Sequence, residues 1–186
     1  VGGKTSSWTG SIRTDTVMGL KIHPENKFGK LRENDNLGPT GFSLTTNKGD
    51  DPTYHIGENM DLAIRLSHDA WVYCFYQQAD GSTIQIFPNP HFLGIFSEPK
   101  LEGKRVHIIP GETTLPFDLK FQPPVGEELL KCFSTSKDIT SQLPAALRGM
   151  SLAPIPKSLD RKLSQIFRAI PNVSVSEASV VVTVVE

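Results

Sequence analysis

Few residues of this chain have the types and spacing that catalysis requires. His68 and Asp69 are adjacent and could supply a general base oriented by a carboxylate. Adjacent residues in a connection between two strands rarely face each other, so we expect these two to form a turn. The segment 41–45 lacks the second glycine of a nucleophile elbow, and the five histidines are scattered. We therefore predict no catalytic residue, while an enzyme whose histidine site is assembled only in space stays open as an alternative.

Two cysteines, Cys74 and Cys132, carry the other reactive groups of the chain. Both lie in predicted strands, and neither belongs to a CxxC or Cys-His cluster, so we predict no metal site and no cofactor. In an oxidising compartment the two thiols could form a disulfide. Otherwise they would be two small buried hydrophobic side chains. The sequence leaves both interpretations open, because it cannot establish that the two residues are close.

Three aromatic residues, Trp71, Tyr73 and Phe75, alternate along one predicted strand and so share one of its faces. If they were exposed, their rings could bind a sugar or a peptide. We predict core packing instead, because this strand is apolar on both faces and belongs in the middle of a sheet.

An apolar loop follows Phe87-Pro88-Asn89, where we expect a strand to end and the Asn89 side chain to bond to nearby backbone groups. The loop either folds back onto the core or presents an apolar patch to a partner. As a partner-binding loop it would use His91, Phe92, Leu93, Ile95 and Phe96.

Composition limits the remaining function classes. The 186 residues carry a formal net charge of -1, with 38% hydrophobic residues, which suits one globular domain. A nucleic-acid-binding surface would need clustered Lys and Arg, so we predict no nucleic-acid partner. The most apolar stretch, residues 180–185, is too short to span a bilayer. Because the sequence starts at Val1 rather than Met, we expect a signal peptide to have been removed or to lie outside it.

Short strands separated by turns account for most of the sequence. Leu62, Ile64 and Leu66 alternate with Asp61, Ala63 and Arg65, which is the period of a half-buried strand. Asp80-Gly81 lies between two strands and supplies the backbone angles of a hairpin turn. The strand expected at 173–185 must pair, because an exposed apolar strand would aggregate, and residues 18–22 are a candidate partner. Strands are predicted at 18–22, 42–44, 62–66, 71–76, 83–87, 106–109, 115–121, 129–134 and 173–185.

The pattern changes after residue 139. Ser158 is expected to cap an amphipathic helix that Pro171 ends, with one apolar stripe of Leu159, Leu163, Ile166, Phe167 and Ile170. We therefore predict a mainly β protein: an antiparallel, immunoglobulin-like β-sandwich with one amphipathic helix and a β-strand near the C-terminus. It would comprise a flexible segment at 1–15, the sandwich at 16–139 and a helix-strand extension at 140–186, packed on the sandwich.

Five motifs in residues 52–139 resemble, in order and spacing, the bacterial domain of unknown function numbered forty-three eighty-four. They are Tyr54-His55-Ile56-Gly57-Glu58, the 71–76 strand running into Asp80-Gly81, Ile86-Phe87-Pro88-Asn89, His107-Ile108-Ile109-Pro110 and Pro124-Val125-Gly126-Glu127-Glu128. Residues 91–104 are an insertion relative to the pattern. We expect structural roles for Gly57, Trp71, Tyr73, Phe75, Asp80, Gly81, Phe87, Pro88 and Asn89.

The resemblance implies a β-rich, mostly secreted or periplasmic module that is often attached to other domains. It implies no activity, so no catalytic residue is carried over from the family. Our leading hypothesis is a non-catalytic, extracytoplasmic module that binds or scaffolds a protein partner, within an envelope or secretion assembly. One alternative is a carbohydrate-binding module that uses exposed aromatic residues, and the other is the enzyme with a spatially assembled histidine site.

Overall fold

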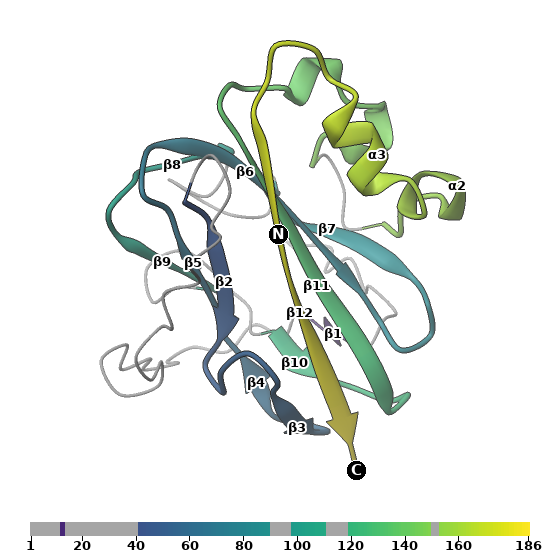
Figure 1. Ribbon diagram of the computed structural model, residues 1–186. Helices are drawn as coiled ribbons and strands as arrows, with labels where there is room; N and C mark the ends of the chain where they lie inside the picture. Colours follow the sequence, from purple (N-terminus) through teal and green to yellow (C-terminus); the bar gives the residue numbers. More distant parts are fainter. Residues whose placement is uncertain (1–11, 14–40, 90–97, 111–118, 150–152) are drawn as a thin grey trace, which may run out of the picture.

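The computed structural model describes residues 12–13, 41–89, 98–110, 119–149 and 153–186. Within these residues the protein has three sheets, mostly of antiparallel strands, and a few short helices. Figure 1 shows long strands crossing the middle of the molecule and the helices gathered on one side of it. The prediction of a mainly β protein is therefore confirmed.

The largest sheet has six strands and forms the centre of the fold. β11 pairs antiparallel with β12 on one side and with β6 on the other. β12 also pairs in parallel with β3, but only through residues 183–185. The order is β3 (Thr53–His55), β12 (Val175–Val185), β11 (Gly126–Thr135), β6 (Ala70–Gln77) and β7 (Thr83–Phe87), and β8 (Lys100–Leu101) pairs with the start of β6.

Two three-stranded sheets complete the β structure. Leu44, Ile64 and Met60 from these sheets join side chains of the central sheet in one core cluster, so the small sheets cover one face of the large one. One small sheet contains β2 (Ser43–Thr46), β5 (Leu62–Arg65) and β9 (Val106–Ile109). The other contains β1 (Ile12–Arg13), β10 (Leu119–Phe121) and β4 (Asn59–Met60).

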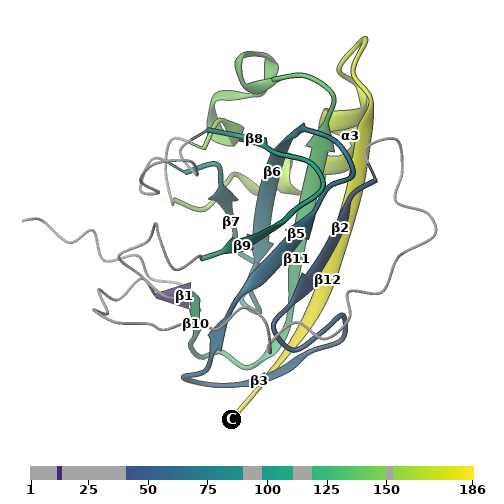
Figure 2. The ribbon, with the colours of Figure 1, turned by 90° about the vertical axis from the view of Figure 1, so that its left-hand side faces the viewer.

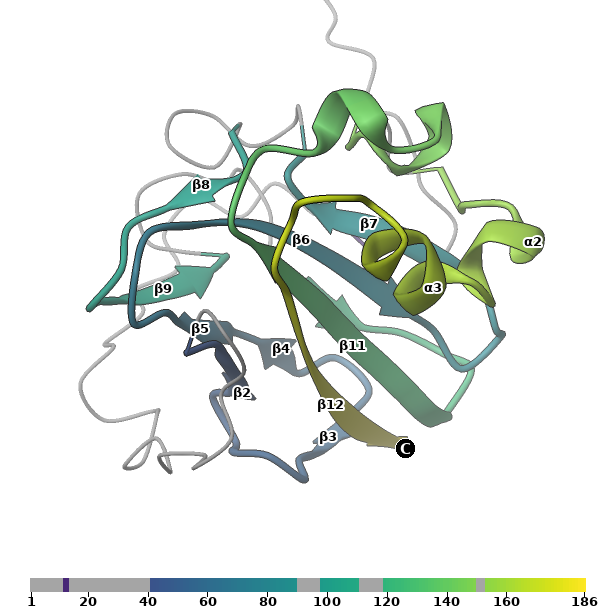
Figure 3. The ribbon, with the colours of Figure 1, turned by 45° about the horizontal axis from the view of Figure 1, so that its top comes forward.

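β6 is covered on both faces because successive side chains of a strand point in opposite directions. Cys74 and Tyr76 belong to the cluster shared with the small sheets, whereas Tyr73 and Phe75 belong to a second cluster. Figure 3 shows β2 and β5 on one side of the central sheet and the helices on the other. The two clusters explain why this strand is apolar throughout.

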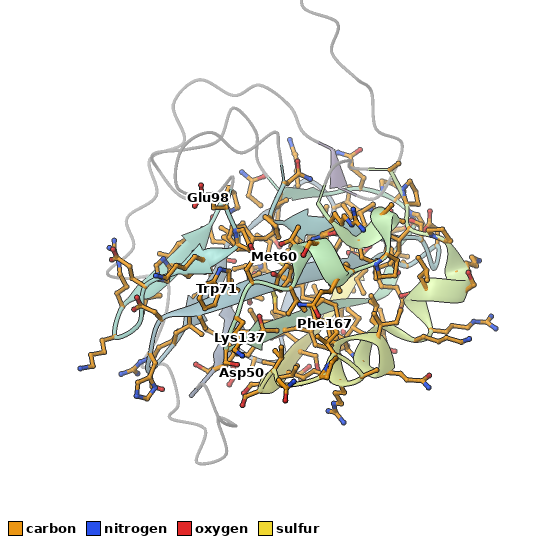
Figure 4. All side chains as sticks on the ribbon, turned by 90° about the horizontal axis from the view of Figure 1, so that it is seen from above. Asp50, Met60, Trp71, Glu98, Lys137 and Phe167 are labelled. Carbon is orange, nitrogen blue, oxygen red and sulfur yellow. A yellow bond between two sulfur atoms is a disulfide. The ribbon has the colours of Figure 1, made fainter. Side chains whose placement is uncertain are left out.

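The segment between β11 and β12, which we call the helical cover, builds the second cluster. Phe167 of the cover stacks on Phe133 of β11 with ring centroids 4.1 Å apart, and Leu163 is buried beside it. Figure 4 labels Phe167 among the side chains of this layer. The helical pieces of the cover are the 3-10 turns Thr140–Gln142 and Ala145–Leu147, α2 (Lys157–Asp160) and α3 (Leu163–Arg168).

The prediction of a single helix capped by Ser158 is wrong. Ser158 lies inside α2, which begins after Pro156, and a separate helix α3 follows. Pro156 suits a helix start because its missing N–H would have no partner there. The two helices are also anchored to different strands: Asp160 accepts a hydrogen bond from Gln77 of β6, whereas Ser164 donates one to Glu177 of β12.

The strand predicted at residues 173–185 is confirmed as β12, and that at 106–109 as β9. β12 pairs with β11 and β3 within the described chain. Residues 18–22, the partner suggested from the sequence, lie outside the described residues.

Candidate functional site

The structure does not pair His68 with Asp69. The Ser67 hydroxyl lies 2.7 Å from His68 Nδ1, while Asp69 accepts a hydrogen bond from Gly103 N at 3.0 Å and lies 3.7 Å from the Lys100 ammonium. The bond from Gly103 and the charge of Lys100 lower the pKa of Asp69. A Cβ at Gly103 would lie 2.4 Å from the carbonyl carbon of His68, so the turn packs tightly against this glycine.

Cys74 and Cys132 form a disulfide with an S–S distance of 2.08 Å. They lie directly opposite each other on β6 and β11, and both are fully buried. In immunoglobulin domains the conserved disulfide joins two sheets, whereas here it joins neighbouring strands of one sheet. The immunoglobulin-like arrangement therefore stays a prediction. Among the described residues, no three His, Cys, Asp or Glu side chains are placed to hold a metal ion.

The residues given structural roles from the sequence lie in turns and in the core. Gly57, with a φ of 88°, forms a turn between β3 and β4. Gly81 has a φ of 77° in the loop between β6 and β7, where Asp80 accepts a hydrogen bond from Ser82 N at 2.7 Å. The Asn89 side chain donates to Gln85 O at 3.2 Å, the kind of backbone bond that the sequence analysis expected after Phe87 and Pro88.

The aromatic residues offer little surface for stacking. Tyr54, Tyr73 and Tyr76 are fully buried, and so is Phe75. Trp71 is partly buried, and the Lys100 ammonium lies 5.6 Å from the centroid of its ring. The loop residues His91, Phe92, Leu93, Ile95 and Phe96 lie outside the described residues.

One edge of β12 is only partly paired. Thr183 and Val185 direct backbone groups away from β11 and bond to the segment around β3 at 3.0 Å each. Backbone groups of residues two apart in a strand point the same way. Those of Glu177, Ser179 and Val181 therefore also point away from β11, and no described strand pairs with them. We call these three residues the open edge.

Two side chains of the open edge are exposed to solvent. Ser179 is exposed, and Val181 is 45% exposed. β2 lies beside β12 in Figures 1 and 2 but pairs only with β5. Proteins usually protect such an edge with proline, lysine or a bulge. β12 contains neither residue type, and its register with β11 continues without a shift over residues 175–184.

A second candidate site, the helix–sheet cleft, lies between the cover and the central sheet. It is a cavity of about 250 Å³ with an apolar floor and a polar rim. The floor comes from Phe75, Leu129 and Leu163, and the rim from residues of the cover and of the adjoining strands. The rim residues are Gln77, Thr83, Lys131, Asp160, Arg161 and Ser164.

Most charged groups of the cleft already have partners. Gln77 Nε2 donates to Asp160 Oδ2 at 3.1 Å, and Lys131 Nζ lies 3.0 Å from Glu177 Oε1, just outside the cleft. Arg161 is exposed and forms no ion pair with any described residue. The Thr83 hydroxyl is buried and lacks a hydrogen-bond partner within the described chain.

Neither candidate site could be predicted from the sequence. The cleft residues come from four separate parts of the chain, and no local motif connects them. For the open edge, the valine-rich stretch predicted the strand, but an apolar strand carries no signal of which edge its neighbours leave free.

Within the described residues, none of the helices is long and apolar enough to cross a membrane. No curated protein and no solved structure matches the chain. A protein-family model, described as a domain of unknown function and named DUF4384, matches residues 53–138. The match contains the strands from β3 to β11, whereas the helices of the cover and β12 follow it. As the sequence motifs predicted, the chain carries a DUF4384 domain over residues 53–138.

Proposed function

We propose that the protein is a non-catalytic, extracytoplasmic module that binds an extended segment of a protein partner at the open edge of β12. The observation that carries this proposal is the row of outward backbone groups at Glu177, Ser179 and Val181, next to exposed side chains. An incoming strand gains main-chain hydrogen bonds at such an edge, and its side chains provide specificity.

The buried disulfide supports the extracytoplasmic part of the proposal. Disulfides persist in secreted and periplasmic proteins and are rare in a reducing cytosol. The Cys74–Cys132 bond links β11, which pairs with β12, to β6, the next strand in the sheet order. The bond would hold β11, on which the partner-binding strand β12 pairs, in place when the module acts within an envelope or secretion assembly.

The alternatives have weaker support. A carbohydrate-binding surface would need exposed rings, and of the described Trp and Tyr residues only Trp71 is accessible, under Lys100. An enzyme would need a base and its orienting carboxylate together, and Asp69 bonds to Gly103 instead of His68. An immunoglobulin-like sandwich and the partner-binding loop at residues 91–96 remain parts of the proposal.

Hydrogen exchange tests the open edge in the isolated protein. We expect the amides of Glu177, Ser179 and Val181 to exchange fast, because they point away from β11. Those of Ala178 and Val180 should exchange slowly, because they point towards it. Site-resolved exchange measured by NMR checks this alternation. Uniform protection along residues 177–181 would contradict an open edge.

Partner binding is tested by replacing Ser179 with proline. Ser179→Pro removes one outward N–H but no bond to β11, and proline is tolerated at strand edges. A photo-crosslinker at Val181 should capture a partner from envelope extract, and Ser179→Pro should reduce capture about tenfold through lost strand pairing.

The matched control is Ser179→Ala, which keeps the backbone N–H and should capture normally. Thermal denaturation of both variants verifies that the fold persists. If folded Ser179→Pro captures the same partner as well as Ser179→Ala does, strand addition at this edge is wrong.

A further inference from the structure

The helix–sheet cleft has the features of a small-ligand site; it meets the open edge only through Glu177, which bonds to Lys131 and Ser164 of the rim. Its cavity of about 250 Å³ lies against β6, β7 and β11, on the opposite side of β11 from the unpaired edge of β12. Cavities that enclose drug-sized ligands measure roughly 300–1,000 Å³, so a smaller group suits this one.

We propose that the cleft binds an apolar side chain that carries a neighbouring carboxylate. Both the C-terminal residue of a peptide and a free apolar amino acid have this chemistry. The apolar part would lie on the floor formed by Phe75, Leu129 and Leu163, where burying it is favourable.

An arginine without an ionic partner would bind the carboxylate of the ligand. The lining has two cations, Lys131 and Arg161, and one anion, Asp160. Lys131 is already engaged by Glu177 at 3.0 Å, and Asp160 by the Gln77 amide at 3.1 Å. Arg161 has no ionic partner among the described residues, and a guanidinium binds a carboxylate through two parallel hydrogen bonds.

The test uses small probes on the whole chain, followed by NMR chemical shifts of the Gln77, Leu129 and Ser164 amides. N-acetyl-L-leucine should bind saturably, with a Kd of about 1 mM. N-acetyl-L-leucinamide, which lacks the carboxylate, and N-acetylglycine, which lacks the side chain, should each bind at least about tenfold more weakly. Two further probes distinguish the two sources: a pentapeptide that ends in leucine, and free leucine. If the natural ligand is a peptide C-terminus, the pentapeptide should bind more tightly than N-acetyl-L-leucine; if it is a free amino acid, free leucine should.

Arg161→Gln should weaken binding of N-acetyl-L-leucine about tenfold without lowering the melting temperature, because Arg161 is exposed and unpaired. The matched control is Lys162→Gln, the same charge change at an exposed neighbour outside the cleft, which should bind normally. The proposal is overturned if the shifts do not saturate below about 20 mM, if the amide binds as well as the acid, or if Arg161→Gln keeps full affinity. Strand addition at the open edge is unaffected by any of these results.

Discussion

Glu177 joins two strands and a helix through its carboxylate. Oε1 lies 3.0 Å from Lys131 Nζ and accepts a hydrogen bond from Ser164 at 2.9 Å, while Oε2 accepts one from Arg168 at 3.1 Å. Burial alone would raise the pKa of Glu177, but the bonds from Lys131 and Ser164 and the two positive charges outweigh it. The pKa of Glu177 is therefore lowered.

Glu177→Gln should destabilise the protein at neutral pH and less so in acid. A carboxylate with a lowered folded-state pKa contributes stability above its unfolded pKa of about 4.3, and this is lost as pH falls through the folded value. We expect the free energy of unfolding to fall by about 1 kcal/mol at pH 7, because solvent screens the charges of this partly exposed network.

Urea denaturation at pH 7 and pH 3 measures this effect. Glu127→Gln, at an exposed position of β11, provides the control and should change little at either pH. If Glu177→Gln lowers the free energy of unfolding by the same amount at both pH values, the charge of Glu177 has no role in stability.

At the residue scale, the sequence could predict roles that depend on local chain geometry. Gly81 in a hairpin loop and the Asn89 side chain on the nearby backbone are of this kind. Arg161 and Glu177 could not be predicted, because their significance depends on strands and helices distant in the sequence. An exposed arginine just after a short helix looks the same in the sequence whether or not a cavity lies beside it.

α3 packs on the central sheet mainly through the ring of Phe167. Phe167 is fully buried, stacks on Phe133, and also meets Phe75 and Tyr73 at centroid distances of 6.0 and 5.5 Å. The stripe of apolar residues predicted this packing face, because helical periodicity places them together. It could not predict the break between α2 and α3, since that depends on the separate anchors of Asp160 and Ser164.

Phe167→Ala should lower the free energy of unfolding by about 3–4 kcal/mol, because it leaves a cavity among rings that cannot fully close over it. Chemical denaturation followed by fluorescence of the nearby Trp71 measures the loss. Gln165→Ala, at an exposed position of the same helix, should stay within about 0.5 kcal/mol of the parent. Similar losses for both variants would mean that α3 contributes through helix formation and not through this ring.

At the scale of the whole molecule, pairing connects distant parts of the chain. The parallel contact of β3 with β12 joins residue 53 to residue 183, and the disulfide closes a separation of 58 residues. Alternation within each strand predicted the mainly β class. It could not predict three sheets, because the choice of neighbours is made by tertiary packing and leaves no periodic signal in either strand.

Reduction of Cys74–Cys132 should destabilise the fold by about 4 kcal/mol, the chain-entropy value for a loop of this length. Urea denaturation with and without dithiothreitol measures it. A Cys74→Ala, Cys132→Ala double variant should unfold at the lower urea concentration and show no response to the reductant. If the reduced parent unfolds at the same concentration as the oxidised one, the bond adds nothing to stability.

The position of β12 in the central sheet also has a consequence for synthesis. This strand leaves the ribosome after every other strand described, yet it fits between β3 and β11, which are made much earlier. In a nascent chain halted before residue 175, one edge of β11 would have no strand to pair with, and the helical cover would not yet be followed by β12. Productive folding must therefore wait for translation of this stretch, and holdase chaperones would have a long interval in which to act on the growing polypeptide.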